Sequence, residues 1–95
     1  MKHKMFVVYD SKVEGYTQPF TAPATGAAIR NFADEANGRR EGSPVKEHPG
    51  DFTLFEIGTY DDQAGVCEMY EAKKSLGTGL DYLREPQAAA IAAVR

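Results

Sequence analysis

One stretch of the chain, residues 25–37, repeats its apolar residues over two turns at the spacing of an amphipathic helix. These residues fall at positions i, i+3, i+4 and i+7, on one helix face: Ile29, Phe32, Ala33 and Ala36. The other apolar runs are short and rich in β-branched and aromatic residues, which favour strands. The chain must therefore bury most of its apolar surface in a sheet that packs against this single well-formed helix.

The ends of the main helix are marked by suitable capping residues. Thr25 is placed to cap its start, and Asn37 followed by Gly38 is a typical stop signal. Residues 38–50 then have the composition of a loop, with two arginines, two prolines and several glycines. We predict a helix over about residues 25–37, followed by a mobile loop.

Strand-like runs flank this helix, with two before it and two after it. They cover residues 4–9, 16–21, 52–59 and 66–70, and the third is the strongest strand signal in the sequence. Turn-forming residues join the first run to the second and the third to the fourth, so each pair is predicted to form a hairpin. Pro19 has no backbone N–H, which places the second run at an edge of the sheet.

A short second helix is predicted near the C-terminus, where Leu76, Leu80 and Leu83 recur at helical spacing after the candidate cap Ser75. The predicted fold class is therefore α+β: an antiparallel sheet of about four strands in ββα-ββα order, with one main helix and one short C-terminal helix. Duplication of a ββα unit is an open interpretation of this order. Residues 1–86 are expected to form a single domain, and residues 87–95 an Ala-rich tail.

Charge and cysteine content restrict the possible functions. The formal net charge is −3 at pH 7, so a protein that holds nucleic acid by overall charge alone is excluded. The single cysteine, Cys67, excludes an intrachain disulfide, and its predicted strand position beside Glu68 favours a small buried hydrophobe over a nucleophile. No apolar run is long enough for a membrane span or a signal peptide, which predicts a cytoplasmic protein.

Neither a metal site nor an enzymatic site is predicted. His48 and Asp51 leave a transition-metal site two ligands short. Asp10, Asp61 and Asp62 occupy predicted turns, where aspartate is favoured because its side chain bonds nearby backbone N–H groups. A pairing of these carboxylates across the two hairpins is the weaker alternative. We expect no cofactor.

Two blocks of the sequence resemble a known viral family. They are KMFVVYDSK at residues 4–12 and HPGDFTLFEIGTYD at residues 48–61. Together with the central helix and the Ser-Leu-Gly run that begins at Ser75, they resemble the small nonstructural protein of gokushovirus-type microviruses, which are phages with single-stranded DNA genomes. The resemblance covers roughly residues 2–83. It implies a DNA-binding protein of the infected bacterial cytoplasm, absent from the virion and linked to synthesis of the single-stranded genome.

Single-stranded DNA binding requires aromatic faces for base stacking and basic side chains along the phosphate path. Two groups of residues meet this need, one in the first hairpin and one after the main helix. The candidate contacts are Lys4, Tyr9, Lys12, Tyr16, Arg39 and Arg40. From these residues and the resemblance, we expect weak binding without sequence preference.

An alternative function belongs to a different class. An acidic chain has no general attraction for phosphate, which favours a protein–protein adaptor that engages a phage or host replication or assembly factor without contacting DNA. In either case the exposed strand edges favour a homodimer.

Overall fold

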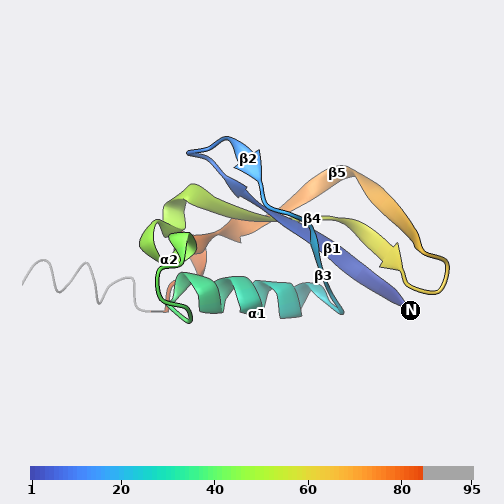
Figure 1. The fold of residues 1–95 in the computed structure, drawn as a ribbon, viewed down its shortest axis with the longest axis horizontal. Helices are drawn as coiled ribbons and strands as arrows, with labels where there is room; N and C mark the ends of the chain where they lie inside the picture. The colour runs from blue at the N-terminus through green and yellow to red at the C-terminus, as the bar shows by residue number, and fades with distance from the viewer. Residues whose placement is uncertain (85–95) are drawn as a thin grey trace, which may run out of the picture.

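β1 runs through the middle of an antiparallel sheet in the computed structural model, which describes residues 1–84 (Figure 1). The sheet has five strands in the order β2-β1-β4-β5, and β3 also pairs with β1. The elements in chain order are β1 (Lys2–Asp10), β2 (Gly15–Tyr16), β3 (Phe20–Ala22), α1 (Thr25–Ala36), α2 (Pro44–Glu47), η1 (Pro49–Asp51), β4 (Phe52–Asp61), β5 (Val66–Thr78) and η2 (Gly79–Tyr82).

The edge of the sheet beside β1 is split into two short strands. Tyr16 in β2 pairs with Tyr9, and Phe20 in β3 pairs with Phe6. Between them the ladder is interrupted where Pro19 lacks a donor, and the backbone N–H of Val8 instead donates to the Thr17 hydroxyl at 3.0 Å. The predicted hairpin and edge position are confirmed, but the predicted count of about four strands becomes five because this run is divided.

α1 packs on one face of the sheet and supplies three buried residues, Ala28, Phe32 and Ala36. The predicted helix is confirmed, and it ends at Asn37 as expected. The predicted cap at Thr25 is wrong, because Ala24 holds the N-cap position without a side-chain hydrogen bond. The Thr25 hydroxyl instead donates to a Glu56 carboxylate oxygen at 2.8 Å.

The core lies between α1 and the sheet. Phe6 and Leu54 are completely buried there, and Phe32 is 5% exposed. The other buried members of this cluster are Val8, Ala22, Ala28, Ala36, Val45 and Phe52. Burial of a single large apolar side chain contributes about 1.5–3 kcal/mol, so these residues account for much of the driving force for folding.

The predicted short C-terminal helix is wrong. β5 continues through Ser75 and Leu76 to Thr78, and only the 3₁₀ turn η2 follows it. Pairing with β4 extends to Thr53 opposite Thr78, so the ladder satisfies backbone groups that a glycine-rich helix would satisfy poorly. Pairing with β4 therefore decides the conformation of this segment in spite of its helical leucine spacing. In the predicted ββα-ββα order, a 3₁₀ turn takes the place of the second helix.

The β4–β5 hairpin is irregular in its middle. Its register shifts between Glu56 and Gly58, where β5 has extra residues. A Cβ atom on Gly58 would lie 2.4 Å from the Glu68 carbonyl oxygen, so this close approach requires glycine. Cys67, near the start of β5, is exposed, which corrects its prediction as a buried hydrophobe.

Residues 38–50 contain more structure than the predicted loop. Ser43 is 2% exposed and caps α2, because its hydroxyl accepts a hydrogen bond from the Val45 backbone N–H at 3.2 Å. Val45 joins the core below it. The predicted Ala-rich tail, residues 87–95, lies outside the described residues. Within residues 1–84, no helix is long and apolar enough to cross a membrane.

Candidate functional site

The face of the sheet opposite α1 carries a cluster of aromatic side chains with a lysine above them. We call it the aromatic–lysine cluster and define it as Tyr9, Tyr16, Phe55 and Lys73. The ring centroids of Tyr9 and Tyr16 are 4.8 Å apart, and those of Tyr16 and Phe55 are 6.1 Å apart. Tyr16 is 50% exposed, so a large part of its ring faces solvent.

The strand register explains why these rings meet. Successive side chains of a strand point to opposite faces. Phe6, Val8 and Leu54 point into the core beneath α1, so Tyr9 and Phe55 point away from it. Tyr16 joins them because β2 places it directly opposite Tyr9.

Lys73 comes from the irregular part of β5 and lies over two of the rings. Its Nζ atom is 5.5 Å from the Tyr16 ring centroid and 5.3 Å from that of Phe55. A cation at this distance from a ring face is attracted by about 0.5–1 kcal/mol at an exposed site. The cluster therefore presents stacking faces and a positive charge at one place.

Ion pairing divides the basic side chains into two groups. Within residues 1–84, the lysines and arginines that make an ion pair are Lys2, Lys4, Arg39, Arg40, Lys46 and Arg84. Those with no carboxylate within 4.0 Å are Lys12, Arg30, Lys73 and Lys74. Lys73 can therefore bind an anion without first breaking an ion pair with any carboxylate of residues 1–84.

The structure brings together only part of the set predicted from the sequence. Tyr9 and Tyr16 form the centre of the cluster, and exposed Lys12 lies in the turn that connects their strands. Arg39 and Arg40 follow α1 and pair with Asp34 at 3.8 Å and Glu35 at 2.5 Å. They do not join the tyrosines.

Lys4 lies on the covered side of the sheet and serves a buried carboxylate. Its Nζ is 3.7 Å from a Glu56 carboxylate oxygen, and Glu56 is 2% exposed. Glu56 also accepts hydrogen bonds from the Thr25 hydroxyl at 2.8 Å and the Tyr70 hydroxyl at 2.5 Å. Burial acts to raise the pKa of Glu56, but these hydrogen bonds, with Lys4 and Lys74 nearby, outweigh it and lower that pKa. Lys4 is therefore a structural residue.

Sequence reasoning missed Phe55 and Lys73. The signal for Phe55 was available, because it alternates with Leu54 and Glu56 in a strand that is apolar on both parities. Lys73 was visible as one of two lysines after the last predicted strand, but nothing in the sequence placed it near the tyrosines, since a helix was expected to follow. Only the extended β5 brings it over the rings.

The acidic turn residues do not come together. Asp10 pairs with Phe52 at one end of the β1–β4 ladder, and Asp61 pairs with Lys2 at the other end. Asp61 accepts hydrogen bonds from the backbone N–H groups of Gln63 and Ala64, as expected for a turn aspartate. A carboxylate site shared by the two hairpins is therefore ruled out.

Comparisons with known proteins identify the family. No curated protein matches the chain, and no solved structure matches it. A family model described as Phage ORF5 protein matches residues 3–82, which include the whole of α1 and almost all of the sheet. The chain is a small bacteriophage protein, and it belongs to the Phage ORF5 protein family.

Proposed function

We propose that this phage protein binds single-stranded DNA weakly and without sequence preference through the aromatic–lysine cluster. One observation carries the proposal: on the face opposite α1, contacting aromatic rings, with Tyr16 half exposed, lie beneath a lysine that pairs with no carboxylate of residues 1–84. Stacking of a base on an aromatic side chain is worth about 1–3 kcal/mol and tolerates any base. The cluster meets these requirements without any base-specific group.

The charge distribution limits how tightly such a strand is held. Most basic side chains of residues 1–84 are engaged by carboxylates, so few phosphates are neutralised without breaking an ion pair. We therefore assign most of the affinity to stacking and expect a shallow salt dependence. Each phosphate contact adds about 0.7 to the slope of log affinity against log salt for single strands.

The role that fits this activity is non-enzymatic. The family is a phage family, and the sequence resembles the nonstructural protein of gokushovirus-type microviruses. We infer an accessory protein of the infected bacterial cytoplasm that binds the viral single strand during genome synthesis. Its task is to hold the strand, for which stacking and charge suffice without a cofactor.

The test measures fluorescence anisotropy of a labelled single-stranded oligonucleotide titrated with wild-type protein and with Tyr16→Ala. We expect the variant to lose about five- to hundredfold in affinity, equivalent to one stacked base. Met69→Ala is the control, because Met69 is 57% exposed on β5 and belongs to no ring cluster. Equal binding by wild type and Tyr16→Ala, with both folded, would contradict the proposal.

An adaptor that contacts protein partners is the second candidate. It is favoured by the same ion pairs, which leave the acidic chain with few cations for phosphate. The two candidates differ in their response to nuclease. A protein partner that the adaptor contacts directly still co-purifies after nuclease treatment of the infected-cell extract. A protein that is captured only through shared DNA is lost after this treatment.

A further inference from the structure

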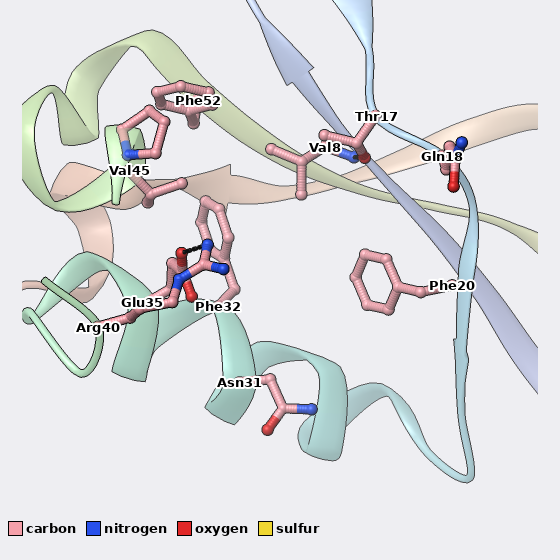
Figure 2. A pocket seen from close by; sticks show the side chains of 11 residues that line it. Val8, Thr17, Gln18, Phe20, Asn31, Phe32, Glu35, Arg40, Val45 and Phe52 are labelled. Carbon is pink, nitrogen blue, oxygen red and sulfur yellow. Dashed lines mark hydrogen bonds and ion pairs between the residues drawn. The ribbon is translucent and has the colours of Figure 1, made fainter. Parts of the chain in front are cut away.

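An apolar pocket of about 550 Å³ opens between α1, α2 and the segment that joins β2 to β3 (Figure 2). Pockets that hold small ligands usually measure about 300–1,000 Å³ and combine apolar walls with a few polar groups. The walls here include Val8, Phe20, Phe32, Val45 and Phe52. This pocket lies on the covered side of the sheet and is separate from the aromatic–lysine cluster.

The polar groups of the pocket are suited to the edge of a nucleobase. Gln18 and Asn31 are exposed carboxamides that carry both donors and acceptors, and both line the pocket. Glu35 contributes a carboxylate held by the Arg40 guanidinium and the Ser43 hydroxyl, each at 2.5 Å. Both of these bonds go to Oε2, which leaves Oε1 as an acceptor for a base N–H.

Arg40 supplies the charge that a nucleotide needs. Its side chain is 70% exposed, and the ion pair to Glu35 uses Nη2. A guanidinium has five N–H donors, so others remain for a phosphate oxygen. A flat aromatic ligand with polar edges and a phosphate thus matches the walls, the carboxamides and the arginine together.

The pocket directly follows the proposed DNA path along the chain. Tyr16 belongs to the aromatic–lysine cluster, and Thr17 and Gln18, the next two residues, line the pocket. The interrupted edge of the sheet is therefore the boundary between the two features. A strand stacked on Tyr16 has only to pass this edge to place a neighbouring base in the pocket.

We propose that the pocket binds one nucleobase of the single strand, with Gln18, Asn31 and Glu35 at the base edge and Arg40 at its phosphate. The proposal deepens the proposed function and rests on it. Guanine suits these groups best, because its Watson–Crick edge presents two adjacent N–H donors, one for Oε1 of Glu35 and one for a carboxamide oxygen. The pocket thus adds a base-reading contact to a surface that otherwise stacks any base.

The probe is dGMP, titrated into ¹⁵N-labelled full-length protein while the side-chain amide resonances of Gln18 and Asn31 are followed by NMR. We expect these resonances to shift and saturate at about millimolar concentration. Deoxyribose 5-phosphate, which lacks the base, is expected to leave them unchanged. Equal shifts with this control would overturn base recognition, because they would show that phosphate alone binds at Arg40.

Variants separate this proposal from the proposed function. Gln18→Ala/Asn31→Ala removes two exposed side chains and is expected to weaken dGMP binding about tenfold. Because this variant lacks both side-chain amides, its binding is followed by the backbone amide resonances of Thr17 and Val45, which also line the pocket. Tyr16→Ala is expected to weaken oligonucleotide binding and leave dGMP binding unchanged. If wild type binds the oligonucleotide through Tyr16 but dGMP shifts neither amide, the pocket proposal fails and the function stands. If dGMP binds but no oligonucleotide does, the single-strand function fails and the pocket survives as a mononucleotide site.

Discussion

The two faces of the sheet carry similar residue types but bury them very differently. On the face beneath α1, Phe6 and Leu54 are 0% exposed, and even the carboxylate of Glu56 is buried among hydrogen-bond donors. On the open face, Tyr16 is 50% exposed and the ammonium of Lys73 lies over the rings of Tyr16 and Phe55. One face therefore uses its aromatic residues for packing, and the other presents them to solvent.

This difference in burial separates aromatic residues whose presence is explained by fold stability from those whose presence is not. Burial stabilises in proportion to the apolar area removed from water, so a completely buried ring such as Phe6 needs no further role. The half-exposed ring of Tyr16 gains much less from folding. Aromatic rings gathered at an exposed place are typical of an interaction site. The comparison assigns stability to the fully buried rings of the covered face and base stacking to the exposed rings of the open face.

The largest expected effect compares one phenylalanine from each face. Phe6→Ala removes a fully buried ring and is expected to lower the free energy of unfolding by about 3–5 kcal/mol. Phe55→Ala removes a partly exposed ring from the neighbouring strand and is expected to cost about half as much or less. Urea denaturation followed by circular dichroism measures both. Equal losses would show that the open face is packed as tightly as the covered one.

The next effect concerns the buried carboxylate. Glu56→Gln weakens hydrogen bonds from Thr25 and Tyr70 and removes the ion pair with Lys4, and it is expected to cost about 1–3 kcal/mol at neutral pH. Glu68→Gln is the matched control. That carboxylate is 71% exposed and pairs with Lys2, so its loss is expected to cost less than about 1 kcal/mol.

The stability lost in Glu56→Gln is expected to depend on pH. The pKa of Glu56 in the folded protein is lower than the ordinary value of 4.5. A carboxylate with a lowered pKa stabilises the fold above its unfolded pKa, and this stabilisation disappears as the pH falls through the folded pKa. The stability difference between wild type and Glu56→Gln is therefore expected to be constant near neutral pH and to shrink in acid. A difference that grows in acid would reverse this assignment.

The smallest effect distinguishes a cation without an ion pair from an ion-paired one. Lys73→Gln is expected to reduce the salt slope of oligonucleotide binding by about 0.7, the value for one phosphate contact with a single strand. Arg39→Gln is expected to leave the slope unchanged, because Arg39 already pairs with Asp34. Anisotropy titrations at several salt concentrations measure both slopes. A larger change for Arg39 than for Lys73 would move the DNA path to the end of α1.

Local sequence patterns correctly predicted the elements whose conformation depends only on residues that are close in sequence. α1 follows from its apolar spacing, and the Asn37 stop follows from local chain chemistry. The position of Pro19 predicted the edge strand, since a missing donor has the same consequence in any sheet. The leucines after Ser75 failed as a helix signal, because pairing with β4 decides the state of that segment and a periodicity count does not include it.

The residues of the candidate site also fall into those that local sequence predicts and those that depend on the fold. Tyr9 and Tyr16 were predictable as partners, because a hairpin places its flanking residues opposite one another. Lys4, Arg39 and Arg40 had the right charge, but each pairs with a carboxylate in the fold: Lys4 with one from β4, and the two arginines with two from the end of α1. Charge is visible in a sequence, whereas its neutralisation depends on which side chains the fold brings within about 4 Å.

By itself, the sequence determined an α+β chain with one amphipathic helix, a hairpin before it, an edge strand marked by Pro19 and an acidic balance that excludes binding by overall charge. Only the tertiary structure decided which face each aromatic ring takes, which lysine lies above the rings and where an apolar pocket opens. The physical reason is the sequence separation over which each interaction acts. Periodicity and turn chemistry act over a few neighbouring residues, whereas burial, ion pairing and cavity shape depend on segments that are distant in sequence and become neighbours only in the folded sheet.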